Sequence, residues 1–289
     1  MSKGARLRAQ RAAKSSPDPV VHMPGVDAKL RRADVHFKAI EREVAGFAVP
    51  NPDHFVSDYD NARHQVITRP HPSLFARRDD WATVIGDCVH NLRSTLDHLA
   101  HELVTLGGGV PQTGRSGTQF PILDSLVGPN GGRRKVHIST ARGKVAPEVF
   151  AFIEGLQPYN RPNNPLDHPL WVLSELDNMD KHRTLALTGV ALSDFALGIN
   201  GLQDLNVHFA AVGFSGPFDE NTELATWNAT VTGPDPQMDM QPRGAIEVAL
   251  APPCIKAGEP LIATLQSLRD YVAYVVDILK FIGGKTAVL

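Results

Sequence analysis

The chain has 289 residues, which is enough for one large domain or two small ones. Its 42% hydrophobic and 21% charged residues are typical of a soluble globular protein, and a formal net charge of −2 gives no overall field toward nucleic acid or membranes. Two cysteines exclude a disulfide framework, and no apolar run reaches the roughly 18 residues of a membrane span. We therefore expect a cytoplasmic protein without a membrane segment.

The first part of the chain predicts a tail, a helix and a hairpin. Residues 1–25 are basic and carry little that a core would bury, so we expect a disordered basic tail. Apolar residues recur every three or four positions over Asp27–Phe47, which predicts a helix that ends before Pro50. Residues 54–69 form two strand-like runs around Asp60–Asn61, which predicts a hairpin.

The segment Asp79–Gly107 predicts the central helix of the fold, about 25 residues long. Asp79 or Asp80 can cap its first turn, and Gly107 is placed to end it. Its buried side should consist of apolar residues at helical spacing. These are Trp81, Val84, Ile85, Cys88, Leu92, Leu96, Leu99 and Leu103.

The same helix carries an unusual set of polar residues. His90, Asp97 and His101 share one face, and Arg93 can reach Asp97 four positions on. A neighbouring stripe carries three more polar residues, Asn91, His98 and Glu102. A merely solvated face would usually carry Lys, Glu and Gln. The set therefore indicates polar contacts inside a bundle, a functional site, or both.

A glycine-rich loop is predicted over 107–143, and it contains Phe-Pro-Ile at 120–122. Arg133, Arg134 and Lys135 form the densest internal basic cluster of the chain. We interpret this cluster first as part of a solvated loop and second as a contact for RNA or phosphate.

Two further helices are predicted, over about 147–156 and 168–183. Asp177, Asp180 and His182 crowd the end of the second one. Acids are unfavourable near a helix C-terminus. We therefore expect Asp177 and Asp180 to have partners among the histidines and the arginine of the central helix.

Between residues 184 and 250, β-branched and aromatic runs alternate with turn residues, which predicts three to five antiparallel strands. The polar stretch 232–244 is expected to be a mobile loop, and 260–282 a final helix. These elements predict an α+β fold in which a helical bundle of about four main helices packs with an antiparallel β-sheet. We expect one domain over residues 26–289.

Four segments occur in a characteristic order: GDCVHNLRSTLDHLAHEL, FPI, LQPY and LSELDNMDKHR, within about residues 80–185. In these four segments and their order, the chain resembles a group of uncharacterised bacterial and phage proteins. The resemblance is specific in its motifs and implies no particular function.

Arg93 and His98 have four residues between them. This spacing resembles the Arg-x4–6-His motif of HEPN domains, a family of helical bundles. The resemblance implies metal-independent RNA cleavage, with His98 acting on the ribose 2′-hydroxyl or the leaving oxygen and Arg93 stabilising the phosphate. It also implies a homodimer and RNA or a nucleotide as partner. Ser94 departs from the family pattern, and five positions on a straight helix place Arg93 and His98 about 140° apart.

Two alternatives remain open. His90, Asp97 and His101, completed by Asp180 or His182, could bind a metal ion, although Arg93 would repel a cation. Alternatively, the Arg, Asp and His residues form a structural network in a non-enzymatic binding or regulatory module. No cofactor motif is present.

Overall fold

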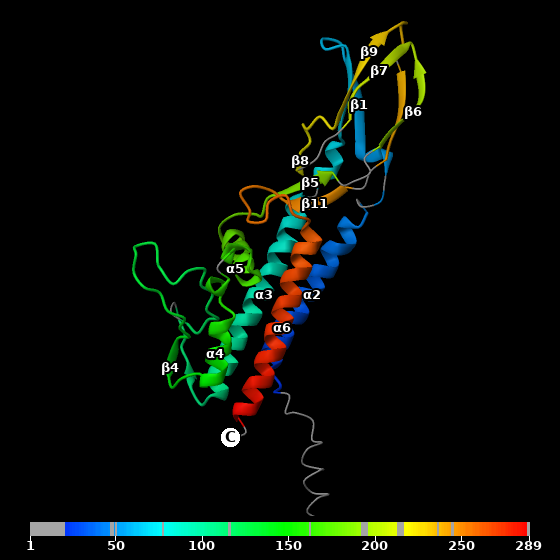
Figure 1. The fold of residues 1–289 in the computed structure, drawn as a ribbon. Helices are drawn as coiled ribbons and strands as arrows, with labels where there is room; N and C mark the ends of the chain where they lie inside the picture. Colours follow the sequence, from blue (N-terminus) through cyan, green and yellow to red (C-terminus); the bar gives the residue numbers. More distant parts are fainter. Residues whose placement is uncertain are drawn as a thin grey trace, which may run out of the picture. The chain divides into compact units, whose positions relative to one another are not determined.

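The computed structural model describes residues 21–46, 49, 51–76, 78–114, 117–161, 163–191, 196–212, 217–235, 237–243 and 246–287. Within them are five α-helices: α2 (Pro24–Val44), α3 (Arg78–Leu106), α4 (Pro147–Gly155), α5 (Pro169–His182) and α6 (Leu261–Ala287) (Figure 1). Four short 3₁₀ helices also occur there: η1 (Pro52–His54), η2 (Pro72–Phe75), η3 (Pro158–Asn160) and η4 (Pro165–Asp167).

The strands pair antiparallel throughout. They are β1 (Phe55–Asp60), β2 (Gln65–Pro70), β3 (Val110–Pro111), β4 (Thr140–Arg142), β5 (Leu187–Ala191), β6 (Ala196–Gln203), β7 (Leu205–Val212), β8 (Pro217–Phe218), β9 (Ala225–Val231), β10 (Gln237–Arg243) and β11 (Ile246–Leu250). The predicted α+β class with an antiparallel sheet is confirmed.

The chain divides into two compact units. Unit 1 comprises Met1–Arg31, Leu92–Trp171 and Asp270–Leu289, and unit 2 comprises Arg32–Asn91 and Val172–Arg269. Helices α2, α3, α5 and α6 contribute residues to both units. The expected single domain over 26–289 therefore stays a prediction.

Unit 1 is built mainly from helices. The apolar positions predicted for this part of α3 are buried as expected: Leu92, Leu96, Leu99 and Leu103. The α6 residue Gly283 lies against α3, because a Cβ there would come 3.1 Å from Leu103 Cδ2. The Lys280 ammonium of α6 binds the Asp27 carboxylate of α2 at 2.5 Å. Hydrophobic burial and a partly buried ion pair together hold these helices.

Unit 2 contains the larger sheets. A four-stranded sheet has the order β1-β2-β9-β7, a three-stranded sheet the order β11-β5-β8, and β10 pairs with β6. Two apolar clusters form the core on these strands and the residues beside them: Val66, Leu205, Trp227 and Ala229 in one, and Leu74, Phe218, Leu224 and Ile246 in the other.

Cys88 lies in the core of the helical part of unit 2, as its place on the apolar side of α3 predicted. Its thiol is fully buried and donates to the Ala33 carbonyl of α2 at 3.5 Å. Burial, reinforced by Asp34, raises the pKa of Cys88 to about 12, so the thiol is unreactive at neutral pH. Arg269 of α6 pairs with Asp34 of α2, and the Trp81 indole N–H donates to Glu43 at 2.7 Å.

Several boundaries need correction. Helix α2 begins at Pro24, and Met23 is buried, so the last residues assigned to the tail belong to the fold; residues 1–20 lie outside the described part. The stretch 232–244 is not all loop, because β10 pairs with β6 there. Strands β3, β4, β6, β8 and β10 are not predicted from the sequence, because glycine, proline and polar residues weaken their signal and partner strands supply the hydrogen bonds.

Within the described residues, no helix has the length and apolar character that crossing a membrane would require.

Candidate functional site

Arg93 and Asp97 bind each other and the backbone of Phe120. The Arg93 Nη2 atom lies 3.0 Å from Asp97 Oδ1 and donates to the Phe120 carbonyl at 3.0 Å. The Phe120 N–H donates to Asp97 Oδ1 at 2.9 Å. The Arg93 side chain is only 13% exposed, and its Nη1 atom is buried without a hydrogen-bond partner in the described structure. These side chains therefore hold the Phe-Pro-Ile segment in place and present little surface to a phosphate.

Gln157, of the LQPY segment, holds the same loop from the other side. Its side chain is buried, accepts from the Leu123 N–H at 2.9 Å, and donates to the Pro121 and Ile153 carbonyls at 3.0 and 2.9 Å. The Tyr159 N–H adds a hydrogen bond to the Leu123 carbonyl. Because an unpaired buried amide is costly, this pattern indicates a structural role for the segment.

His98 does not share a site with Arg93 within one chain. Helix α3 is continuous from Arg78 to Leu106, so the two side chains stay about 140° apart. His98 is exposed and lies beside Gly25, where a Cβ would come 3.1 Å from His98 Nδ1. A site shared between two subunits stays a prediction.

Asp177 has the histidine partner that the sequence predicted. Its carboxylate is buried; Oδ1 lies 3.1 Å from His90 Nδ1 and Oδ2 2.5 Å from Lys181 Nζ. Both partners are about half exposed. Burial, then the charges of Asp177 and Asp87, raise the pKa of Asp180 next to this pair. The cluster is acidic, and a phosphate would be repelled from it.

The remaining predicted residues do not complete a metal site. His101 and His182 are exposed, and the Asn91 side chain donates to the Asp87 carbonyl at 2.7 Å. Among the described residues, no three His, Cys, Asp or Glu side chains are arranged to hold a metal ion. The ligand set considered from the sequence is therefore not brought together.

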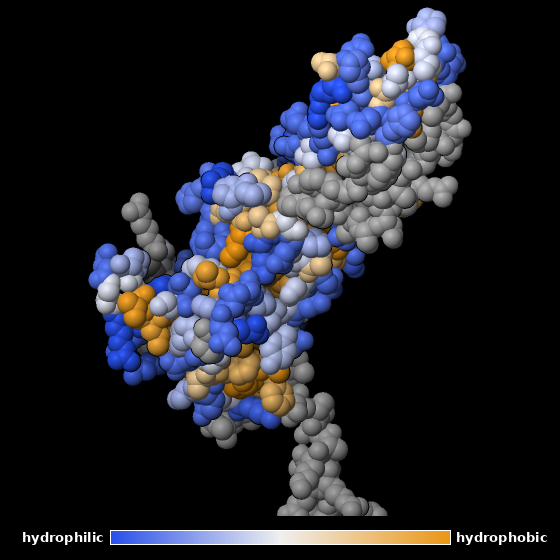
Figure 2. All heavy atoms as spheres, turned by 45° about the horizontal axis from the view of Figure 1, so that its top comes forward, coloured by the Kyte–Doolittle hydropathy of each residue, from blue (hydrophilic) through white to orange (hydrophobic). Residues whose placement is uncertain are grey.

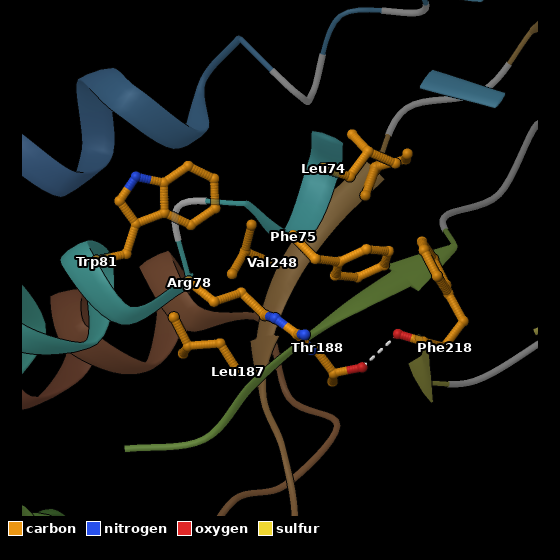
Figure 3. A pocket seen from close by; sticks show the side chains of 9 residues that line it. Leu74, Phe75, Arg78, Trp81, Leu187, Thr188, Phe218 and Val248 are labelled. Carbon is orange, nitrogen blue, oxygen red and sulfur yellow. Dashed lines mark hydrogen bonds between the residues drawn. The ribbon is translucent and has the colours of Figure 1, made fainter. Parts of the chain in front are cut away.

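A small cavity lies in unit 2, beside the start of α3 (Figure 3). Arg78 stacks over the Phe75 ring at 4.9 Å and pairs with Glu220 at its edge. The cavity volume is about 20 Å³, which is room for about one water molecule. It is therefore a packing gap and not a ligand site.

A much larger pocket lies in unit 1, where the segment 136–145 meets α4. Strand β4, in this segment, lies beside α4 (Figure 1). The pocket volume is about 430 Å³, within the range of roughly 300–1,000 Å³ typical of small-molecule sites. Its lining is Val136, His137, Ile138, Thr140, Gly143, Lys144, Val145, Pro147 and Phe150.

Two features of the sequence shape this pocket: the alternation of buried and exposed residues at 136–138, and the glycine at position 143. Val136 and Ile138 are buried while His137 between them is exposed, which is the pattern of an extended segment on a core. Gly143 has φ +77° and lies so close to Gly109 that a Cβ would come 2.8 Å from its Cα. Only glycine fits there. The Thr140 hydroxyl closes the turn by donating to the Gly143 carbonyl at 2.8 Å.

A basic rim lies within the pocket segment and just before it in the sequence, and two of its residues, His137 and Lys144, line the pocket. We use this name for five exposed residues, Arg133, Lys135, His137, Arg142 and Lys144. Their side chains form no hydrogen bond or ion pair with any other residue that the structure describes, whereas Arg134 pairs with Asp124 at 2.8 Å. Residues 125–147 contain five Lys or Arg and no Asp or Glu. The rim is therefore a local positive surface on a chain with a net charge of −2.

No protein-family model, curated protein or solved structure matches the chain. The HEPN resemblance and the resemblance to bacterial and phage proteins therefore stay predictions. The site is assigned from its own geometry.

Sequence reasoning found part of this site. It noted the cluster at 133–135 but ranked a solvated loop above a phosphate contact. The buried–exposed alternation at 136–138 and the absence of acids over 125–147 were available signals. The pocket itself was not, because Phe150 of α4 meets the segment only in the folded chain.

Exposed hydrophobic residues give no comparable site. Val127 and Val110 are exposed in the same loop region. Figure 2 shows hydrophobic residues as separate orange patches among hydrophilic ones on the face in view. Scattered exposed apolar residues are normal on globular proteins, so we assign no docking surface to them.

Proposed function

We propose that this protein binds RNA or a nucleotide through the pocket and its basic rim, without catalysis by Arg93 and His98. The observation that carries the proposal is the set of five exposed basic side chains without partners among the described residues, beside a pocket of about 430 Å³. Protein cations that are neutralised by neighbouring carboxylates, as Arg134 is by Asp124, contribute little to phosphate binding. Cations without carboxylate partners are available for it.

Arg93 and Asp97 have a structural role in this proposal. Their contacts to Phe120 are directed at the protein backbone, and Asp177 is likewise occupied by His90 and Lys181. These contacts support the structural alternative considered from the sequence, and with it a binding module over a nuclease. A cytoplasmic location belongs to the same proposal and is supported by two buried free cysteines.

The test is fluorescence anisotropy with a labelled single-stranded 12-nucleotide RNA at several salt concentrations. The rim variant Lys135→Ala/Arg142→Ala/Lys144→Ala should weaken binding at least tenfold. If the protein contacts three to five phosphates, a plot of the logarithm of the association constant against the logarithm of the salt concentration should have a slope of about −2 to −3.5 for the wild type. The slope should be shallower for the variant.

A matched control removes three exposed basic residues elsewhere: Arg31→Ala/Arg32→Ala/Lys38→Ala on α2. It lowers the net charge equally and should change affinity less than threefold. Both variants are first compared with the wild type by circular dichroism and thermal unfolding. Equal losses in the two variants, or no binding by the wild type, would overturn the proposal.

A further inference from the structure

The pocket contains chemistry that a phosphate alone would not use. Five of its lining residues are apolar: Val136, Ile138, Val145, Pro147 and Phe150. The Lys144 ammonium and the His137 imidazole, which can donate a hydrogen bond, line it as well. A ligand that matches both features has an apolar body and an anionic group attached to it.

We infer that the pocket receives one unstacked nucleobase of a single-stranded RNA, with the adjoining phosphate held by Lys144 and His137. The inference rests on the proposed function and specifies its ligand. Phe150 is the only Phe, Tyr or Trp residue of the lining, and its ring offers a face on which a base can stack. Val136, Ile138 and Val145 of the loop line the same pocket.

The volume agrees with an occupant of this size. About 430 Å³ exceeds what a single phosphate needs and suits a ligand of nucleotide size. A base inside a duplex is paired and stacked, so it cannot enter a pocket without being extruded. Single-stranded RNA therefore fits the site, and duplex RNA contacts only the basic rim.

The polar groups of the lining predict little base specificity. The Thr140 hydroxyl is already engaged with the Gly143 carbonyl. His137 and Lys144 are assigned to the phosphate. Recognition then depends on the area of the stacked ring, so adenine should bind more tightly than uracil, without discrimination between the two purines.

The experiment compares two labelled single-stranded 12-mers of equal charge, oligoadenylate and an abasic ribose-phosphate strand, and a self-complementary RNA duplex. Wild-type protein should bind oligoadenylate about five to 100 times more tightly than the abasic strand. The variant Phe150→Leu should lose most of this preference, and Phe150→Trp should keep it. Phe281→Leu, at an exposed aromatic position on α6, is the matched control and should change nothing.

Each outcome separates the two proposals. If the abasic strand binds as tightly as oligoadenylate while the rim variant still weakens binding, the base pocket is wrong and RNA binding by the rim stands. If no strand binds, RNA binding itself is wrong. Competition by dodecyl phosphate at lower concentration than by AMP would make the pocket a site for an acyl chain and overturn the inference. The inference would also be overturned if the Phe150→Leu variant preferred oligoadenylate over the abasic strand as strongly as the wild type does.

Discussion

The carboxylate of Asp180 lies directly against the backbone of Gly86. A Cβ on Gly86 would come 2.1 Å from Asp180 Oδ1, a separation that van der Waals radii forbid. Glycine inside a helix costs about 1 kcal/mol relative to alanine. The contact explains why α3 contains this glycine at the point where α5 packs.

Gly86→Ala should therefore destabilise the protein by about 1–3 kcal/mol, because the gain in helix propensity is smaller than the cost of displacing Asp180. The measurement is urea unfolding of Gly86→Ala, Asp180→Ala and the double variant. In the Asp180→Ala background the same glycine substitution should stabilise by about 1 kcal/mol.

Gly155→Ala, at the end of α4, is the control for this cycle. A Cβ there meets no atom within 4 Å, so the substitution should be neutral or slightly stabilising. Equal effects of Gly86→Ala in the presence and absence of Asp180 would show that the contact does not constrain the glycine.

Asp180→Asn should stabilise the folded protein at neutral pH. Burial, Asp177 and Asp87 raise the pKa of Asp180 in the folded state, so its ionised form opposes folding. This penalty is absent below the unfolded pKa, near 3.8, and develops as pH rises through the folded pKa. Unfolding at pH 3 and pH 7 tests it: the gain from Asp180→Asn should appear at pH 7 and disappear at pH 3.

Arg93→Met should destabilise the protein by about 2–3 kcal/mol, because Asp97 and the Phe120 carbonyl lose a charged hydrogen-bond donor. Denaturant unfolding gives the value. RNA affinity of the folded variant should be unchanged. Arg63→Met, which removes an arginine from an exposed pair with Glu223, should have little effect on stability. A stable Arg93→Met protein that had lost RNA binding or cleavage would instead return Arg93 to a functional site.

His168 caps α5 and should make stability depend on pH. Its Nδ1 atom accepts from the Leu170 N–H at 3.2 Å, and its Nε2 atom lies 3.3 Å from the Tyr271 hydroxyl. Burial, reinforced by Arg161, lowers the pKa of His168 from 6.5 to about 4. The unfolded chain therefore binds a proton first, and the contribution of His168 is complete above pH 6.5 and lost as pH falls toward 4.

The expected loss is at most about 3 kcal/mol between pH 6.5 and 4. His168→Asn keeps a capping acceptor and removes the titrating ring. Its unfolding free energy should fall less steeply over this range than that of the wild type. If the unfolding free energies of the two proteins fell equally steeply with pH, His168 would not be responsible for the pH dependence of stability.

Most of the secondary structure is predictable from local sequence patterns. Helix α3 and the hairpin of β1 and β2 lie within one residue of their predicted positions, because apolar periodicity and turn residues act over a few neighbouring positions. The pairing of Arg93 with Asp97 was equally predictable, since a helix brings positions four apart together. Strands such as β10 were not, because their hydrogen bonds come from a distant segment.

Which polar residues have partners depends on contacts between distant segments of the folded chain. Arg93 binds the backbone of Phe120, 27 positions away, and His90 lies beside Asp177, 87 positions away. The same histidine, arginine and aspartate residues could have formed a nuclease site, a metal site or a structural network. Periodicity places a side chain on a helix face, but what that face contacts depends on how the chain folds back on itself. The same holds for the basic rim, whose five side chains have no partner among the described residues, whereas Arg134 in the same segment pairs with Asp124.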